Sequence, residues 1–314
     1  MVRVGVIGVG HLGKEHARIY HELPEAHLIG ICDKDASKKE RADILGTAFF
    51  KDHKALFGQV DAVSIATPTA EHFKVARDFL SRGIHTLIEK PITLKVEDAD
   101  ELIDLAVKNN CYLQVGHIER HNPGYKRVEE IAKNIRFMEI HRLGPFTGRI
   151  NDCGVVLDLM IHDIDIVLGL VKSEILSYDA IGINVLTPYE DIANVRIKFK
   201  NGAVVDMTAS RLSPEKQRKI RIFQEDAYIS LDYGEQKAKI FRKKFLQIAQ
   251  EEIDIEKSEP LKDELKYFLS QISTGKGLGK PDTAARDALK LAVEIVETIQ
   301  KNQKEFQVLS KNAR

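Results

Sequence analysis

The chain contains no tryptophan and only three cysteines among its 314 residues, and its acidic and basic side chains are equal in number. Cys32, Cys111 and Cys153 form no Cys-x-x-Cys pair, so neither a zinc ribbon nor a dithiol redox motif is indicated. A net charge of zero gives no indication of a nucleic-acid partner. No apolar run approaches the roughly 18 residues of a membrane-spanning helix, and no signal peptide precedes the first strand-like run. We therefore expect a cytoplasmic protein with reduced thiols and no membrane partner.

The first 120 residues show a regular alternation of short apolar runs with amphipathic stretches. Strands are predicted at 4–7, 28–31, 62–66, 86–88 and 112–115, and helices at 11–23, 37–45, 70–81 and 96–109. Strands that alternate with helices are typical of βαβ units and a parallel sheet. We therefore predict an α/β protein in which residues 1–120 form a Rossmann domain.

The pattern changes near Gly116, and residues 121–314 are predicted to form a second domain of the α+β class. Strand-like runs follow at 137–143, 176–184, 195–199, 204–209, 220–223 and 228–231, with helices at about 155–170, 261–273 and 283–302. Asn201-Gly202 joins two of these runs and is typical of a tight hairpin turn. The second sheet is therefore expected to be mostly antiparallel.

A glycine-rich loop, Gly8-Val9-Gly10-His11-Leu12-Gly13, follows the first predicted strand and opens the first predicted helix. In such a loop Gly8 permits a tight turn, Gly10 lets the backbone approach a pyrophosphate, and Gly13 lets the helix pack close to the strand. The helix N-terminus would direct unsatisfied N–H groups at the phosphates. Asp33 ends the second predicted strand, 20 residues after Gly13, where a carboxylate binds the ribose hydroxyls of NAD and repels the 2′-phosphate of NADP. We therefore predict NAD as the cofactor.

Two further loops should lie at the same ligand-binding edge of the parallel sheet. Thr67 and Pro68 follow one predicted strand and are expected to cap the next helix. A contact from Thr67 to the dinucleotide is predicted as well. Lys90, within Glu89-Lys90-Pro91, ends the following strand. A lysine held there can hydrogen-bond a substrate hydroxyl, or give up its charge when it is desolvated.

A second group of polar residues that could carry chemistry lies on the predicted helix 155–170. Asp158 and His162 are four residues apart and share one face, with Asp165 near it, in an otherwise apolar stretch. A carboxylate one turn away can orient an imidazole and raise its basicity. The same pair could ligate a metal, but the sequence offers no suitable third ligand, so no metal is predicted.

Together these motifs resemble the Gfo/Idh/MocA oxidoreductase family, named after glucose–fructose oxidoreductase and inositol dehydrogenase. The matching residues are Gly8-Val9-Gly10-His11-Leu12-Gly13, Glu89-Lys90-Pro91, Gly116-His117, Arg120-His121-Asn122-Pro123 and the Asp158/His162 pair. The resemblance, which extends over essentially the whole chain, implies a large open sheet in the second domain. It also implies a homo-oligomer, a dimer or a tetramer, formed through that sheet. Lys90 would orient and polarise the reacting hydroxyl, with Asp158 and His162 in the same site.

Within the family, the run from Asp152 to Asp163 and the run from Gly116 to Arg120 resemble the nucleotide-sugar 3-dehydrogenases, including those that act on UDP-N-acetylglucosamine. His121 and Cys153 depart from the residues usual at these positions. The resemblance implies an NAD-dependent dehydrogenase that oxidises a secondary sugar hydroxyl, at C3 of a UDP-sugar, by hydride transfer to nicotinamide.

The predicted contacts fall into two sets. Those to NAD are Gly8, Gly10, His11, Leu12, Gly13, Asp33, Thr67, Pro68, His72, Glu89 and Lys90. Those to the substrate are Lys90, Arg120, Asn122, Arg149, Asp158 and His162. Arg120, Arg142 and Arg149 could reach a pyrophosphate, whose oxygens suit the guanidinium fork. These arginines favour a nucleotide sugar over a free polyol.

Alternatives stay open for the function and for the proton acceptor. The function could be that of a dehydrogenase for a free polyol such as inositol, or of an NAD-sensing regulatory protein without catalysis. The presence of Lys90, Asp158 and His162 together argues against the regulator. The base could be His162, whose unperturbed pKa of about 6.5 suits proton transfer near neutrality. It could also be Lys90, if burial and a neighbouring imidazole lower its pKa.

Overall fold

The computed structural model describes residues 1–148, 153–245 and 247–312 and divides the chain into two compact units. Unit 1 comprises Met1–Ile118 and Glu259–Leu289, and unit 2 comprises Glu119–Ser258 and Lys290–Arg314. The first division lies close to the boundary predicted near residue 120. The return of 259–289 to unit 1 was not anticipated, because it depends on long-range packing: three apolar residues of this segment lie in the core formed by the first strands. These residues are Leu265, Phe268 and Leu269.

Unit 1 contains a six-stranded parallel sheet in the order β3-β2-β1-β4-β5-β6, the strand order of a Rossmann fold. Its strands are β1 (Val2–Ile7), β2 (Ala26–Cys32), β3 (Ala48–Phe50), β4 (Ala62–Ile65), β5 (His85–Glu89) and β6 (Leu113–Gly116). All of them except β3 coincide with predicted strands. β3 has only three residues, none of them buried, so it lacks the apolar run that identifies a strand in a sequence.

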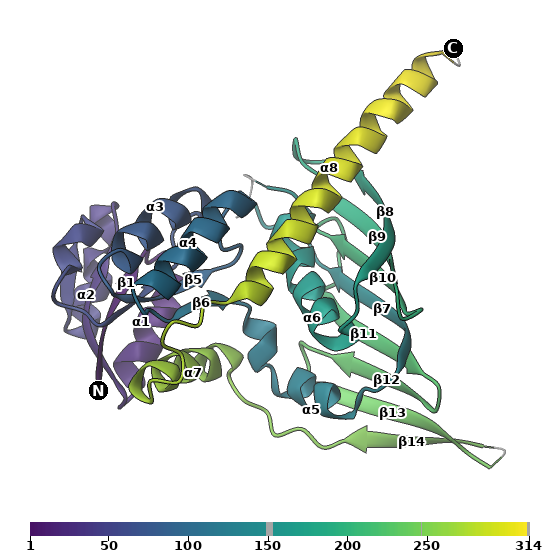
Figure 1. The fold of residues 1–314 in the computed structure, drawn as a ribbon, viewed down its shortest axis with the longest axis horizontal. Coiled ribbons are helices and arrows are strands. Elements are labelled where there is room, and N and C mark those ends of the chain that lie inside the picture. The colour runs from purple at the N-terminus through teal and green to yellow at the C-terminus, as the bar shows by residue number, and fades with distance from the viewer. Residues whose placement is uncertain (149–152, 246, 313–314) are drawn as a thin grey trace. The chain divides into compact units, whose positions relative to one another are not determined.

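The helices of unit 1 follow the predicted alternation with the strands (Figure 1). They are α1 (Gly13–Glu22), α2 (Lys39–Leu45), α3 (Thr69–Leu80), α4 (Val96–Lys108) and α7 (Pro260–Ser273), with short 3-10 turns at Ala36–Lys38 and His53–Leu56. Apolar side chains of α1 and α7 pack with β1 and β2 into one buried cluster. The parallel sheet therefore presents the carboxyl ends of β1, β2, β4 and β5 at one edge, where the predicted cofactor residues lie.

Unit 2 contains an eight-stranded sheet in the order β14-β13-β12-β11-β7-β10-β9-β8. Its strands are β7 (Ile135–Leu143), β8 (Ile175–Ile183), β9 (Ile192–Phe199), β10 (Val204–Ser210), β11 (Gln217–Gln224), β12 (Ala227–Asp232), β13 (Lys237–Lys244) and β14 (Gln247–Ile253). Every neighbouring pair is antiparallel except β7 and β10, which confirms the predicted mostly antiparallel sheet. β13 and β14 were not predicted, since their Lys- and Glu-rich sequences show little apolar alternation.

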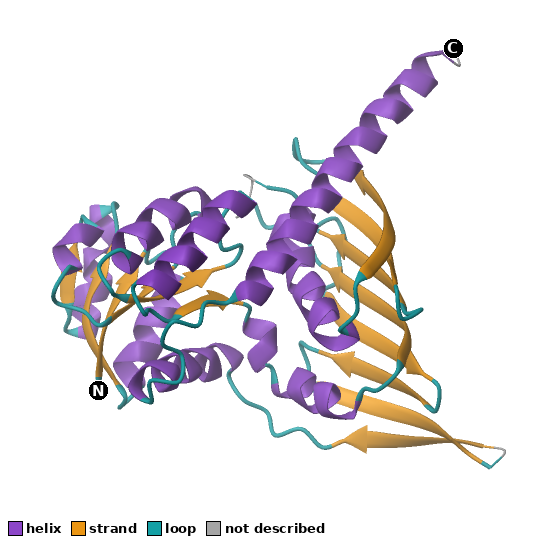
Figure 2. Ribbon diagram, in the orientation of Figure 1, coloured by secondary structure: helices purple, strands orange, loops and turns teal. Residues whose placement is uncertain are grey.

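Helices cover one face of this sheet, and Figure 2 shows no helix of the described residues against the other. The covering helices are α5 (Pro123–Ile131), α6 (Ile161–Val171) and, along β8, the part of α8 (Thr283–Asn312) that belongs to unit 2. Asn302 and Gln303 of α8 donate to the backbone carbonyls of Ala180 and Gly182 in β8, at 3.0 and 2.7 Å. We call the covered face inner and the other outer. Within the described residues, no helix is both long and apolar enough to cross a membrane.

Candidate functional site

The glycine-rich loop of unit 1 has the backbone geometry that a bound pyrophosphate needs. Gly8 has a φ of 81°, a left-handed conformation that favours glycine. A Cβ on Gly13 would lie only 1.8 Å from the Gly8 carbonyl oxygen, so α1 packs against the end of β1 as closely as predicted. No described atom lies within 4 Å of a Cβ built on Gly10, which leaves room for phosphate oxygens. His11 and Leu12, the neighbouring predicted contacts, are exposed.

Asp33 lies beside this loop, at the carboxyl end of β2. Its carboxylate accepts the backbone N–H groups of Val9 and Asp35, each at 2.9 Å. A cavity of about 740 Å³ opens next to it, a volume within the range of small-molecule sites. The predicted cofactor contacts that line this cavity are Gly8, Asp33, Thr67 and Pro68. Loops that follow three different strands therefore contribute to one concave surface, which fits the adenosine end of a dinucleotide.

Thr67 does not have the capping role that the sequence predicts. Helix α3 begins at Thr69, its N-cap is Pro68, and no side chain caps its first turn. Thr67 lies one residue too early to cap this helix. Its hydroxyl is buried and, within the part of the chain described, has no hydrogen-bond partner. A buried polar atom without a partner in the wall of a cavity fits a role in ligand binding.

The His72 ring contacts the backbone of two loops, the one that carries Thr67 and the one that carries Lys90. Its Nδ1 lies 2.9 Å from the carbonyl oxygen of Pro91, and its Nε2 lies 2.9 Å from that of Thr67. Burial lowers the pKa of His72, whereas the carbonyl oxygens of Pro91 and Thr67 act in the opposite direction. His72 therefore holds backbone in place, and its direct contact to the cofactor stays a prediction.

Glu89 and Lys90 end β5, and their side chains have different surroundings. Glu89 is buried; its Oε1 lies 2.9 Å from Nε2 of His16, whose Nδ1 lies 2.6 Å from the hydroxyl of Ser64. Burial alone would raise the pKa of Glu89, but the hydrogen bond and charge of His16 and the charge of Lys90 lower it. Oε2 of Glu89 accepts the Lys90 backbone N–H at 3.3 Å. A buried carboxylate thus fixes the backbone of half-buried Lys90, which precedes a cis peptide bond to Pro91.

The remaining predicted catalytic residues lie in unit 2, on a helix that begins with a π turn. Asp158 lies in this π turn (Val156–Met160), and His162 lies in the first turn of α6. The predicted alignment of Asp158 with His162 assumes a continuous α-helix, whereas a π turn places its side chains at a wider spacing. Both side chains are half-buried. A single π turn inside an α-helix is frequent at functional sites.

Glu190 holds the start of this π turn. Its Oε1 accepts the backbone N–H of Val156 at 3.2 Å, and its backbone carbonyl accepts that of Val155 at 2.9 Å. A Cβ on Gly154 would lie 1.9 Å from the same carboxylate, so any larger residue here would displace the Glu190 side chain. Burial raises the pKa of Glu190 above its usual value. One buried side chain therefore fixes the path along which the chain enters the helix of Asp158 and His162.

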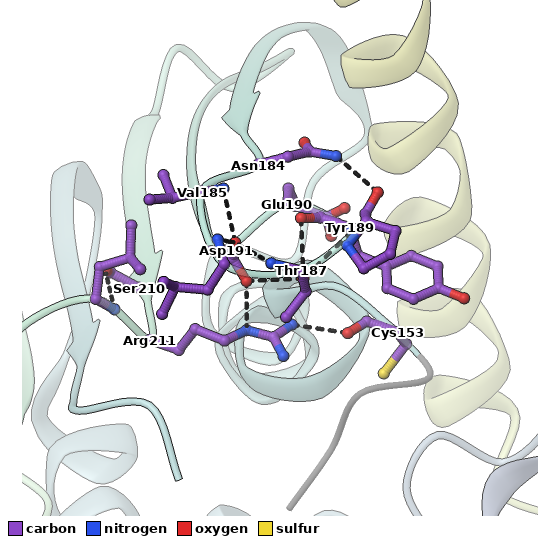
Figure 3. Close-up of polar contacts among 12 residues, drawn as sticks. Cys153, Asn184, Val185, Thr187, Tyr189, Glu190, Asp191, Ser210 and Arg211 are labelled. Atoms are coloured by element: carbon purple, nitrogen blue, oxygen red, sulfur yellow. Dashed lines mark hydrogen bonds and ion pairs between the residues drawn. The ribbon is translucent and has the colours of Figure 1, made fainter. Parts of the chain in front are cut away.

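Asp191 and Arg211 fix the segment just before the π turn (Figure 3). Arg211 donates to the Cys153 carbonyl at 2.7 Å, and its Nε lies 3.5 Å from Oδ1 of Asp191. Asp191 is buried and also accepts three backbone N–H groups at 2.6–3.0 Å. The donors are those of Val185, Leu186 and Thr187. The position of Asp158 thus depends on residues more than twenty positions away, which the sequence did not indicate.

Two of the arginines predicted to reach a pyrophosphate are paired with carboxylates of unit 2. Arg142 is buried and donates to Asp163 at 2.7–3.1 Å and to Glu119 at 3.0 Å. Burial would lower the pKa of Arg142, but Asp163 and Glu119 raise it, so the guanidinium stays charged. Arg120 donates from Nε to Oδ2 of Asp165 at 2.7 Å. Arg142 is therefore not available to a phosphate, and the substrate contact of Arg120 stays a prediction.

Asn122 also has a structural role. Its Oδ1 accepts the Gly124 backbone N–H at 3.0 Å, which caps α5, and its Nδ2 lies 3.3 Å from both Glu119 Oε2 and the Tyr233 carbonyl. Arg149, the remaining predicted substrate contact, lies outside the described residues. Among the residues that are described, no three His, Cys, Asp or Glu side chains gather as a metal-binding group.

Both parts of the chain match a known family. Residues 2–117 match the model described as an oxidoreductase family with an NAD-binding Rossmann fold, and residues 138–230 match the GFO/IDH/MocA C-terminal domain. UDP-N-acetylglucosamine 3-dehydrogenase of Acidithiobacillus ferrooxidans is 36% identical over 302 residues, which cover 94% of this chain and 96% of that protein. scyllo-Inositol 2-dehydrogenase (NAD(+)) of Bacillus subtilis is 30% identical over 233 residues, 68% of each chain.

Solved structures give the same picture. That of UDP-N-acetylglucosamine 3-dehydrogenase from Acidithiobacillus ferrooxidans matches with a TM-score of 0.90 at 36% identity, over 96% of this chain and 98% of that one. Levoglucosan dehydrogenase in complex with NADH matches with a TM-score of 0.85 over 96% of this chain and 97% of that one. Its identity is 19%, so this second likeness shows the fold alone.

Proposed function

The chain belongs to the Gfo/Idh/MocA oxidoreductase family and is an NAD-binding oxidoreductase, and we propose that it oxidises the C3 hydroxyl of a UDP-sugar related to UDP-N-acetylglucosamine. The observation that carries this proposal is the 36% identity, over 94% of the chain, to an enzyme named for that activity. The inositol dehydrogenase of Bacillus subtilis aligns with only 68% of the chain at 30% identity. A nucleotide sugar is therefore the better-supported substrate class.

Unit 1 binds and orients the cofactor. NAD, when bound, accepts the hydride from the carbon whose hydroxyl loses its proton. The open space at Gly10 receives the pyrophosphate, the Asp33 carboxylate accepts the ribose hydroxyls, and Thr67 contacts the dinucleotide from the cavity wall. Asp33 also excludes a 2′-phosphate by charge repulsion. Unit 1 alone therefore supplies these proposed contacts to NAD, and they do not depend on a bound substrate.

Lys90, Asp158 and His162 act on the substrate hydroxyl. In one version His162 accepts the hydroxyl proton, Asp158 orients the imidazole, and Lys90 stabilises negative charge on the same oxygen. In the other version Lys90 accepts the proton and His162 acts beside it. The half-buried positions of all three side chains support both versions. Arg120, Asn122 and Arg149 remain proposed substrate contacts.

A substrate panel tests this function. The full chain is incubated with NAD and, separately, with UDP-N-acetylglucosamine, other UDP-sugars, inositol isomers and free sugars, and NADH is followed by its absorbance. We expect UDP-N-acetylglucosamine to have the highest kcat/KM of the panel. Turnover of a free polyol without turnover of any UDP-sugar would assign the chain to the second substrate class. Tight NAD binding with no turnover at all would favour a regulatory protein.

We also propose a homo-oligomer, a dimer or a tetramer, formed through the outer face of the unit 2 sheet. Four half-buried rings stack across adjacent strands of this face, with centroids 4.7–5.6 Å apart. They are Phe137, Phe223, Tyr228 and Phe241. Light scattering should give an oligomer mass for the parent chain and a monomer mass for Phe223→Glu. A cytoplasmic location is proposed as well, supported by the buried thiols of Cys32 and Cys111, which form no disulfide within the described residues.

A further inference from the structure

The inner face of the unit 2 sheet carries two arginines directly opposite each other. Arg218 of β11 pairs in register with Arg142 of β7, its neighbouring strand (Figure 1). Buried Ile220 and Ile222 lie on the same side of β11 as Arg218. The Arg218 side chain therefore projects from the inner face of the sheet. Like charges directly opposite on neighbouring strands destabilise a sheet unless each has a partner.

The two arginines differ in their partners. Arg142 has two carboxylates, Glu119 and Asp163, each within 3.1 Å. Within the described chain, the Arg218 guanidinium has no hydrogen bond and no ion pair, although the residue is only half-exposed to solvent. A partly desolvated charge without a partner is costly, so this position favours a partner that the described chain does not supply.

The charged groups that act on Arg218 are Arg142, Glu119, Asp163 and Asp158. Burial and the charge of Arg142 lower the pKa of Arg218, so its surroundings do not fully compensate its charge. Glu119 and Asp163 are engaged by Arg142, and Asp158 belongs to the proposed catalytic set. The charge of Asp158 thus acts on Arg218, and within the described residues no carboxylate is paired with Arg218.

We propose that Arg218 binds an anionic oxygen of the substrate, namely one of the diphosphate group of a nucleotide sugar. The proposal rests on the proposed function, because it deepens the choice of substrate class. A guanidinium presents two parallel N–H groups that match two phosphate oxygens, and both donors of Arg218 are uncommitted. A free polyol has no anion for this position. Arg218 thus takes the role that the sequence suggested for Arg142.

Binding of UDP alone, measured by calorimetry on the full chain loaded with NADH, tests the proposal without requiring turnover. Arg218→Gln should weaken UDP by about 10- to 100-fold, the loss expected for one or two hydrogen bonds to a charged group. Arg218→Lys keeps the charge but not the fork and should fall between the parent and Arg218→Gln. Arg127→Gln is the matched control: Arg127 lies on α5, about half-exposed and paired with Glu130, and this variant should bind UDP like the parent.

Thermal unfolding of the same variants separates ligand binding from a structural role. Because Arg218 has no partner within the described part of the chain, Arg218→Gln should melt within a few degrees of the parent without UDP and lose most of the stabilisation that UDP gives the parent. Unchanged UDP affinity in Arg218→Gln would overturn the proposal, as would a large loss of stability without ligand. If the parent binds UDP through Arg218 but oxidises no UDP-sugar, the proposed reaction fails while the assignment of Arg218 stands.

Discussion

The cofactor edge of unit 1 and the inner face of unit 2 hold their functional groups in different ways. In unit 1 the backbone defines the site: Gly13 is pressed against Gly8, and Asp33 accepts backbone N–H groups. In unit 2 buried charges define it, as in the Arg142–Asp163 pair, whose members are 21 positions apart. A backbone-defined site depends on short motifs and tolerates changes around it. A site built on buried ion pairs depends on every member of the network.

The largest expected effect is on turnover. Lys90→Met removes the ammonium that we propose acts on the substrate oxygen, and kcat should fall by on the order of 10²- to 10⁴-fold. NAD affinity should stay near that of the parent, because the proposed contacts of the glycine loop and Asp33 hold the other end of the cofactor. Steady-state kinetics and NADH fluorescence titration measure the two quantities. A kcat within a few-fold of the parent would remove Lys90 from the mechanism.

The dependence of unit 2 on its buried ion pairs should show in its stability, by comparison with an exposed ion pair of the same unit. Arg142→Met leaves Glu119 and Asp163 buried without their cation and should cost about 3–5 kcal/mol of unfolding free energy. Arg136→Met breaks an exposed pair with Glu225 and should cost less than about 1 kcal/mol. Urea unfolding of both variants gives these values. Equal, small losses would show that the buried network is not what stabilises unit 2.

Acid should remove the contribution of Asp191. Burial alone would raise its pKa, but the backbone N–H groups that it accepts lower it below the value in the unfolded chain. Its stabilisation is therefore complete above about pH 4 and is lost as the pH falls through the lowered folded pKa. Asp191→Asn should be less stable by about 1.5–3 kcal/mol at pH 7. Melting curves at pH 7 and pH 2 measure the gap, and a gap that persists unchanged at pH 2 contradicts this origin.

Cofactor choice should show the smallest effect. The parent should prefer NAD to NADP, and Asp33→Ala should reduce that preference by about tenfold or more by removing repulsion of the 2′-phosphate. The ratio of kcat/KM values for the two cofactors is the measurement. Because Asp33 also binds the Val9 and Asp35 N–H groups, Asp33→Asn serves as the control that keeps a side-chain oxygen. A parent chain that uses NADP as well as NAD would refute the assignment of Asp33.

The sequence predicts most of the fold, because the elements of both units have local signals. The alternation in the first 120 residues predicts five of the strands of the parallel sheet, and the motif at Gly8–Gly13 predicts the turn between β1 and α1. β13 and β14 are not predicted, because their Lys- and Glu-rich sequences show little apolar alternation. The packing of α7 in unit 1 is not predicted for another reason. It depends on contacts between residues more than 200 positions apart, such as that of Arg18 with Glu259.

The candidate site is predicted less completely. Gly8, Gly13 and Asp33 have the geometry expected, since a turn and a strand end are local features. His16 and Glu190 could not be found, because each acts through a partner distant in the sequence, Glu89 and Val156 respectively. The arginines show most clearly what the sequence alone does not predict. Nothing local distinguishes Arg142 from Arg218; only the fold shows that Arg142 pairs with carboxylates, whereas Arg218 has no such partner among the described residues.

Isotope labelling follows the hydride itself and directly tests the proposed oxidation at C3 of the UDP-sugar. UDP-N-acetylglucosamine carrying deuterium at C3 is incubated with NAD and the full chain, and the mass of the NADH formed is measured. We expect NADH one mass unit heavier and a slower rate than with unlabelled substrate, because the C3–hydrogen bond breaks as the hydride leaves. NADH without deuterium from this substrate, or labelled only when another sugar carbon carries deuterium, would contradict it.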